Sequence, residues 1–170
     1  MDRGGVMTTV TVISCSDAAL EDAAEDRAGT VLREGLASLG FQVSDPQIVP
    51  CDTSLITSAL VDAFHGGARV AITAGASGLL PQDVAVEATM PLVEFEIPGI
   101  MEEIRRRGAE KTPLSLLSRG VAGVAELPGL PRSLVVNAPG SRGGARDTLA
   151  VLGPMLERIV ASLDGVGHDR

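Results

Sequence analysis

The stretch Arg69-Val-Ala-Ile-Thr-Ala-Gly-Ala-Ser-Gly-Leu-Leu-Pro-Gln-Asp83 decides the fold. Its first part, from Arg69 to Thr73, is short and apolar, which predicts a strand. Small residues follow at positions 74–78, where backbone N–H groups can approach an anion without obstruction from side chains. The stretch therefore predicts a strand that leads directly into an anion-binding loop.

The last residue of this loop, Asp83, has two possible roles. Its carboxylate could cap the helix that follows, or it could hold a magnesium ion. A plain strand-to-helix turn with a capping aspartate explains the same residues. The loop has neither the Gly-Lys-Ser/Thr of a Walker motif nor the spacing of a dinucleotide fingerprint.

Outward from this loop, predicted strands alternate with predicted helices. Strands are expected over 6–15, 41–49, 69–73, 120–127 and 133–138, with Pro46 making the second an edge strand or interrupting it. Helices are expected over 26–39, 52–64, 84–90, 97–107 and 144–163, with a short helix from Thr112-Pro113 to near Arg119. The order predicts an α/β fold with a mostly parallel sheet covered on both faces. We expect one domain over 1–170, with loose ends at about 1–6 and 165–170.

Three loops that follow predicted strands, after Cys15, Thr73 and Ala138, are expected to converge. Ligands of such sheets bind beyond the carboxyl ends of the strands. Ser16 and Asp17, at the end of the first strand, could therefore contact a ligand. Without further information, the residues alone favour a simple turn.

The other polar candidates also have structural explanations. The turn Asn137-Ala-Pro-Gly-Ser141 could donate hydrogen bonds to a phosphate from Ser141 and nearby backbone, or be a structural turn. Asp52 could share a metal ion with Asp83, although a role as helix N-cap suffices to explain it. Arg119 could reach a phosphate or an acidic neighbour.

The composition excludes several classes of function. A net charge of −8, no Trp or Tyr and only three Phe argue against nucleic-acid binding, which needs a basic face and stacking platforms. The two cysteines make neither a disulfide framework nor a zinc site. No window reaches the roughly 18 uninterrupted apolar residues of a membrane span, and no secretion signal is visible. We therefore expect a soluble, cytoplasmic protein that does not bind a membrane.

Taken together, these segments resemble the Mog/MoaB family of molybdenum cofactor biosynthesis, whose fold also occurs in the G domain of gephyrin. The resemblance covers roughly residues 9–163. Its landmarks are Ser16-Asp17, Glu25-Asp26 with Gly29, Val49-Pro50, Asp83-Val84, Glu87-Ala-Thr89, Glu96-Ile-Pro-Gly-Ile100, Thr112-Pro113, Leu117-Ser-Arg-Gly-Val-Ala-Gly123 and Asn137-Ala-Pro-Gly-Ser141.

The resemblance implies a three-layer α/β/α sandwich assembled as a homotrimer. Active members transfer an adenylyl group from Mg-ATP to the terminal phosphate of molybdopterin and release pyrophosphate. By resemblance, Asp83 would bind Mg²⁺, and Asp52 is the second candidate catalytic acid. The residues expected to bind molybdopterin or ATP are Ser16, Asp17, Thr73, Gly75, Ala76, Ser77, Gly78, Glu87, Pro98, Gly99, Ser118, Arg119, Asn137, Pro139, Gly140 and Ser141.

This chain departs from the family pattern at several positions. The family loop reads Thr-Gly-Gly-Thr-Gly, whereas here Ala76 replaces the second glycine and Ser77 the threonine. Gln82 replaces an arginine before Asp83, and Cys51 replaces an aspartate after Pro50. Three hypotheses follow: an active adenylyltransferase, a paralogue that binds pterin or nucleotide with little catalysis, and a scaffold.

Overall fold

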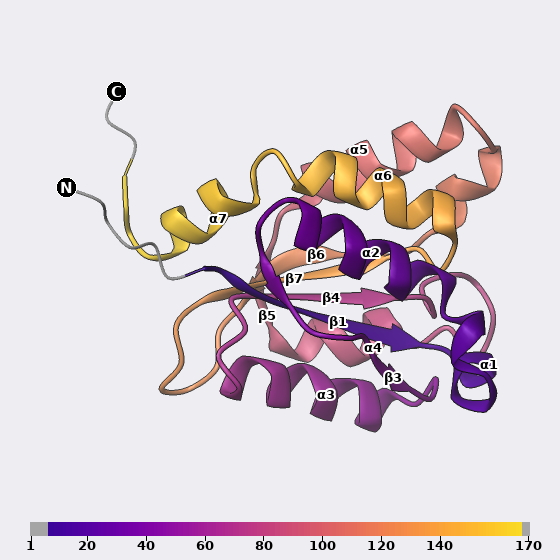
Figure 1. The fold of residues 1–170 in the computed structure, drawn as a ribbon, viewed down its shortest axis with the longest axis horizontal. Helices are drawn as coiled ribbons and strands as arrows, with labels where there is room; N and C mark the ends of the chain where they lie inside the picture. The colour runs from indigo at the N-terminus through magenta and orange to yellow at the C-terminus, as the bar shows by residue number, and fades with distance from the viewer. Residues whose placement is uncertain (1–6, 168–170) are drawn as a thin grey trace.

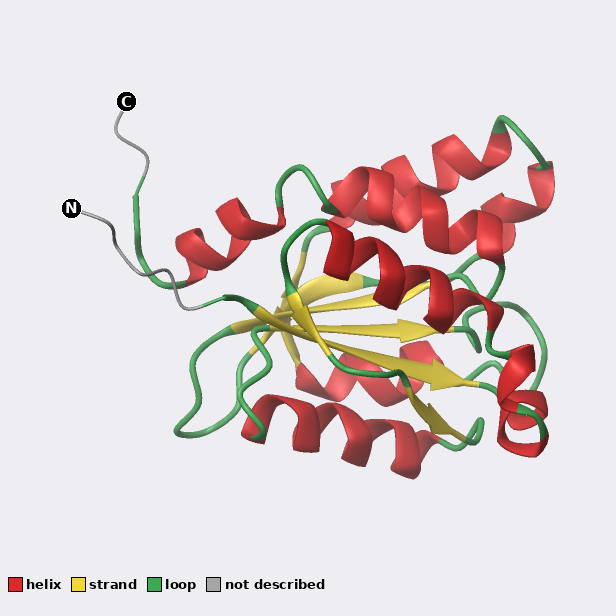
Figure 2. Ribbon diagram, viewed as in Figure 1, coloured by secondary structure: helices red, strands yellow, loops and turns green. Residues whose placement is uncertain are grey.

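The computed structural model describes residues 7–167 and has three layers, with one sheet between two layers of helices (Figures 1 and 2). The seven-stranded sheet has the order β2-β1-β4-β7-β6-β5, and β3 also pairs with β1. This architecture confirms the predicted α/β sandwich. The strands are β1 (Thr9–Cys15), β2 (Gln42–Val43), β3 (Gln47–Val49), β4 (Val70–Ala74), β5 (Val93–Glu96), β6 (Ala122–Ala125) and β7 (Ser133–Ala138).

The sheet is mostly parallel, as predicted. Strands β2, β3 and β4 run parallel to β1, and β7 runs parallel to β4. Only β6 runs against its neighbours, since it pairs antiparallel with both β5 and β7. The carboxyl ends of β1, β4 and β7 therefore open at one edge of the sheet, where α/β proteins bind ligands.

Helices cover both faces of the sheet. They are α1 (Asp17–Glu21), α2 (Arg27–Ser38), α3 (Thr53–His65), α4 (Ala85–Thr89), α5 (Pro98–Ala109), α6 (Arg142–Leu152) and α7 (Leu156–Leu163), with 3-10 turns η1 (Ala23–Glu25), η2 (Met90–Leu92) and η3 (Pro113–Leu117). Side chains alternate along a strand, so Val70 and Ile72 face one layer and Ala71 the other. The first layer contains α2, α5, α6 and α7, and the second contains α3 and α4 (Figure 1).

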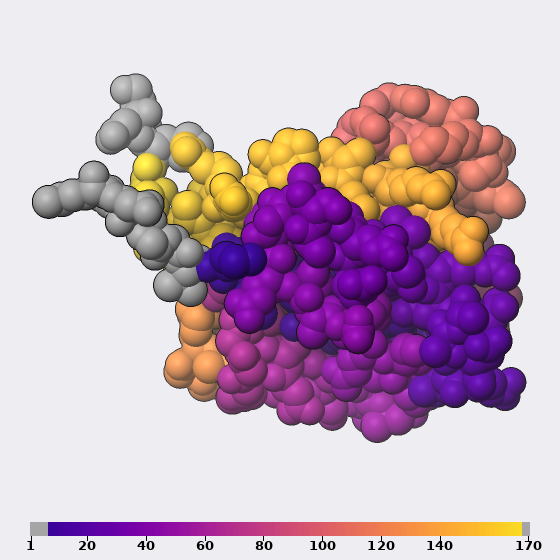
Figure 3. Space-filling view, viewed as in Figure 1, coloured from indigo at the N-terminus to yellow at the C-terminus, as the bar shows by residue number. Residues whose placement is uncertain are grey.

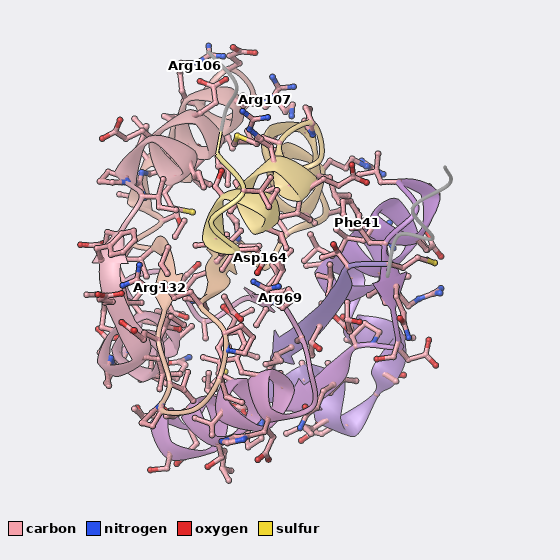
Figure 4. The ribbon with its side chains drawn as sticks, turned by 90° about the vertical axis from the view of Figure 1, so that its left-hand side faces the viewer. Phe41, Arg69, Arg106, Arg107, Arg132 and Asp164 are labelled. Atoms are coloured by element: carbon pink, nitrogen blue, oxygen red, sulfur yellow. The ribbon has the colours of Figure 1, made fainter. Side chains whose placement is uncertain are left out.

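An ion pair fastens the end of the molecule opposite the carboxyl edge. Arg69, just before β4, donates two hydrogen bonds to the Asp164 carboxylate, at 2.7 and 3.1 Å, and a third to the Arg132 carbonyl oxygen. Figure 4 views this end and shows Arg69 and Asp164 pointing toward each other. The contact joins the sheet to the residue that follows α7.

One predicted helix is wrong in its extent, whereas the interruption expected at Pro46 is confirmed. The helix predicted over 144–163 is two helices, because Pro154 has no N–H to continue the first and α6 stops at Leu152. The strand predicted over 41–49 is the pair β2 and β3, which are interrupted around Pro46. Both short strands pair with β1 at the sheet edge.

One strand, β5, is missing from the prediction, which placed no element between the helices expected over 84–90 and 97–107. Three of the four residues of β5 are exposed, so its sequence lacks the apolar signal of a buried strand. Among residues 7–167, no helix combines the length and apolar character needed to cross a membrane. The predicted loose end at 1–6, and 168–170 of the other, lie outside the described residues.

Candidate functional site

The loops after β1, β4 and β7 meet at Gly75. The Gly75 N–H donates to the Ala138 carbonyl oxygen at 3.1 Å. A Cβ on Gly75 would lie 2.7 Å from the Cys15 carbonyl oxygen, and one on Gly140 would lie 3.0 Å from the Gly75 Cα. The predicted convergence is therefore observed, and it depends on glycines at the points of closest approach.

The loop after β4 (residues 75–83, the β4 loop) is closed by Asp83. Its Oδ2 accepts the Leu80 N–H at 2.9 Å, and its own N–H donates to the Leu80 carbonyl oxygen at 2.9 Å. The possibility that Asp83 caps the next helix is not observed, because Val84 is the N-cap residue of α4 and no side chain caps it. Asp83 Oδ1 makes no hydrogen bond within the described part of the chain.

A pocket of about 480 Å³ opens beside this loop. It lies between the β4 loop, the C-terminal part of α5 with η3, and the start of α6. Figure 3 shows the salmon segment around η3 next to α6 at the right-hand end of the molecule. Six predicted ligand-binding residues line it, namely Ser77, Gly78, Ser118, Pro139, Gly140 and Ser141.

The start of α6 gives this pocket an anion-binding character. Ser141 Oγ accepts the Gly144 N–H at 3.0 Å and so caps the helix. Ser141, Gly143 and Gly144 all line the pocket, so the first turn of α6 faces it. A helix N-terminus presents unpaired N–H groups and partial positive charge, which suits a phosphate.

Two pocket residues, Lys111 and Asp147, are not among the site residues predicted from the sequence. Lys111 Nζ donates to Asp147 Oδ1 at 2.6 Å, and the Asp147 carboxylate is almost fully buried. They are 36 residues apart, so no local motif links them. The signal available in the sequence was a charged residue, Asp147, at a core-facing position of the predicted last helix.

Residues 11–158 match the family model described as a probable molybdopterin binding domain. The chain belongs to this family. It is 35% identical over 92% of its length to a molybdenum cofactor biosynthesis bifunctional protein of Chlorobaculum tepidum, and spans 49% of that protein. It is 32% identical to a molybdopterin adenylyltransferase of Pyrococcus furiosus, covering 83% of this chain and 82% of that one. The Mog protein of Mycobacterium ulcerans superimposes with a TM-score of 0.83, at 34% identity over 95% of this chain and 99% of that one.

Two predicted ligand residues of this molybdopterin-binding domain, Thr73 and Asn137, are fully buried. Asn137 Nδ2 donates to the hydroxyls of Thr73 and Thr89, both at 2.9 Å, and its Oδ1 accepts the Val121 N–H at 3.1 Å. This network joins β4, β7 and α4 beneath the loops. Contact between either side chain and a ligand stays a prediction that rests on the resemblance.

The polar side chains predicted as site residues at the ends of β1 and β3 accept hydrogen bonds from the protein backbone. Ser16 Oγ caps α1, and Asp52 Oδ1 caps α3 by accepting the Leu55 N–H at 2.9 Å. Asp17 Oδ1 accepts the Cys51 N–H at 3.0 Å. The N-cap role predicted for Asp52 is therefore confirmed, and its catalytic role stays a prediction.

Cys51 stands where the family has an aspartate, and it cannot supply the missing charge. Burial first, and the charge of Asp17 next, raise the pKa of the Cys51 thiol. The thiol is therefore neutral near pH 7. Within residues 7–167, no group of three or more His, Cys, Asp or Glu side chains is arranged to hold a metal ion.

Glu87, Pro98, Gly99 and Arg119 do not line this pocket. Arg119 donates to one Glu87 carboxylate oxygen at 2.7 Å. Pro98 lines a second hollow of about 350 Å³ together with Ser118 and Arg119. Gly99 lines neither hollow.

The ion pair at Glu87 predicts a pH-dependent contribution to stability. The hydrogen bond from Arg119 lowers the pKa of Glu87, so the contact stabilises the fold at pH 7 and is lost as the pH falls through that lowered pKa. We expect the wild type to melt above Glu87→Gln at pH 7 and the two to converge in acid. A difference in melting temperature that does not change with pH would contradict this ion-pair contribution.

Ala76 adopts a backbone conformation that favours glycine, with φ of 52°. This is the position where the family has its second glycine. Ala76→Gly should raise the free energy of unfolding by about 0.5–1 kcal/mol, because an L-residue in the left-handed region is strained. Urea unfolding measures the change, and an equal or lower midpoint would show that Ala76 is unstrained.

Proposed function

We propose that this chain is a molybdopterin adenylyltransferase that transfers AMP from Mg-ATP to the terminal phosphate of molybdopterin. An oxygen of that phosphate attacks the α-phosphorus of ATP and forms a new P–O bond. The bond from the α-phosphorus to the bridging oxygen breaks, and pyrophosphate leaves with its electron pair. The observation that carries the proposal is the pocket between the β4 loop and the first turn of α6.

This reaction needs a site that holds two anionic groups close together. The small residues of the β4 loop leave backbone N–H groups accessible, and the start of α6 adds a second set of donors. Lys111 lines the same pocket wall, where its ammonium group is paired with the Asp147 carboxylate. These groups would orient the phosphates for attack and stabilise the charge that develops on their oxygens.

The chemistry of Asp83 fits a magnesium ion. Mg²⁺ keeps several waters and takes one or two carboxylates together with substrate phosphates, so a cage of protein ligands is not required. The Leu80 N–H fixes the Asp83 carboxylate through Oδ2, which leaves Oδ1 available to accept a cation. When bound, the ion would neutralise phosphate charge as a Lewis acid.

The departures at Ala76, Gln82 and Cys51 favour one alternative, a paralogue that binds molybdopterin or nucleotide without turnover. The resemblance also supports a cytoplasmic homotrimer, and sedimentation equilibrium giving a monomer would contradict that assembly. Calorimetric titration with each ligand, paired with a pyrophosphate-release assay, separates the two functions. Binding with turnover supports the transferase, and binding without turnover supports the paralogue.

A further inference from the structure

Arg119 connects both ends of the β4 loop. Its backbone N–H donates to the Ser77 carbonyl oxygen at 2.8 Å. Its Nε donates to the Gly78 carbonyl oxygen and its Nη2 to the Asp83 carbonyl oxygen, both at 2.7 Å. Its Nη1 donates to Glu87 Oε1 on α4, also at 2.7 Å.

The segment that Arg119 spans has little packing of its own. Leu79 is 65% exposed and Leu80 is 60% exposed, and Pro81 and Gln82 are exposed as well. Apolar burial therefore does little to fix the path from Gly78 to Asp83. Hydrogen bonds set it, and those from Arg119 join residues that are not adjacent in sequence.

We propose that Arg119 is the positioning residue of the β4 loop, holding Gly78 and Asp83 in the places where phosphate and metal are to be bound. Its Nε, Nη1 and Nη2 each donate to the loop or to Glu87, so the guanidinium is held against the protein, and on this proposal it acts through the loop. The sequence left two possible partners for Arg119, a phosphate or an acidic neighbour, and Glu87 is such an acidic neighbour. The consequence for catalysis rests on the proposed adenylyl transfer.

The geometry requires the planar fork of an arginine. Lysine carries the same charge on a single nitrogen and cannot reach two carbonyl oxygens and a carboxylate in fixed directions. A phosphate ligand, in contrast, would be replaced in part by lysine, which binds phosphate as a point charge. Arg119→Lys therefore separates positioning from phosphate binding.

The kinetic experiment compares Arg119→Lys and Arg119→Ala with the wild type. We expect both variants to lower kcat by about 100-fold, since a displacement of about 1 Å can have that effect, with little change in the KM for ATP. Arg106→Ala is the matched control, because within residues 7–167 the exposed Arg106 side chain (Figure 4) pairs only with Glu103 on α5 and with Glu110, just after it. Retention of the wild-type kcat by Arg119→Lys would overturn the proposal, as would a raised KM with unchanged kcat.

Amide hydrogen exchange tests the positioning without any activity. The Leu80 and Asp83 N–H groups, which close the loop, should exchange roughly tenfold faster or more in both Arg119 variants. The amides of Ile72 and Val136 in the sheet should keep their protection, and Arg106→Ala should match the wild type. Unchanged exchange at Leu80 and Asp83 overturns the proposal, and so does a loss of protection throughout the sheet. A wild type without adenylyl transfer refutes the proposed function, while the exchange rates still decide the role of Arg119.

Discussion

Asp83→Asn is expected to lower the kcat of adenylyl transfer about a thousandfold, since metal-assisted charge stabilisation contributes several kcal/mol to such reactions. The asparagine oxygen can still accept the Leu80 N–H, so the loop keeps its shape while the negative charge is lost. Steady-state kinetics over a range of Mg²⁺ concentrations measures the effect. A kcat within about threefold of the wild type would exclude Asp83 as the metal ligand.

Asp52→Asn tests the second candidate acid in the same way, because asparagine caps helices as well as aspartate does. The cap of α3 should survive this change, and with it the position of the loop after β3. A kcat within about twofold of the wild type would leave the N-cap as the supported role of Asp52. A large loss of kcat with unchanged stability would instead assign Asp52 to the catalytic machinery.

Gly75→Ala is expected to lower the free energy of unfolding by about 3 kcal/mol, combining backbone strain with overpacking. Gly75 has φ of 94°, and its added Cβ would lie 2.7 Å from the Cys15 carbonyl oxygen. The three loops would have to separate, so adenylyl transfer should fall as well. Urea unfolding measures the stability.

Gly40→Ala isolates the contribution of the backbone angle. Gly40 has φ of 90°, but an added Cβ there would meet no atom within 4 Å. This change should lower the free energy of unfolding by only about 1 kcal/mol. Equal losses for the two variants would mean that the close approach of the loops at Gly75 costs nothing.

The layers and the candidate edge could be predicted because they follow from local patterns. Apolar strands such as β4 and β7 are buried throughout, and an apolar segment signals that burial directly. The loops after β1, β4 and β7 then had to share an edge, because parallel strands end on the same side. Strand β5 was not predicted because it is an edge strand with mostly exposed side chains, which need not be apolar.

The walls of the pocket could not be predicted in the same way. Lys111 and Asp147 are brought together by the packing of α5 against α6, and no sequence pattern encodes that contact. Thr73 and Asn137 are a second case, because the resemblance marked both as ligand-binding residues, and their contact with a ligand stays a prediction. Both side chains take part in a buried hydrogen-bond network, whose partners lie far apart in the sequence.

The central claim is that the β4 loop and the start of α6 form an adenylyl-transfer site. The most direct measurement is mass spectrometry of the products after the wild-type protein is incubated with molybdopterin and Mg-ATP. We expect adenylylated molybdopterin and pyrophosphate in equal amounts, with neither formed when magnesium or molybdopterin is left out. Molybdopterin that binds but is recovered unmodified, with ATP intact, would contradict it.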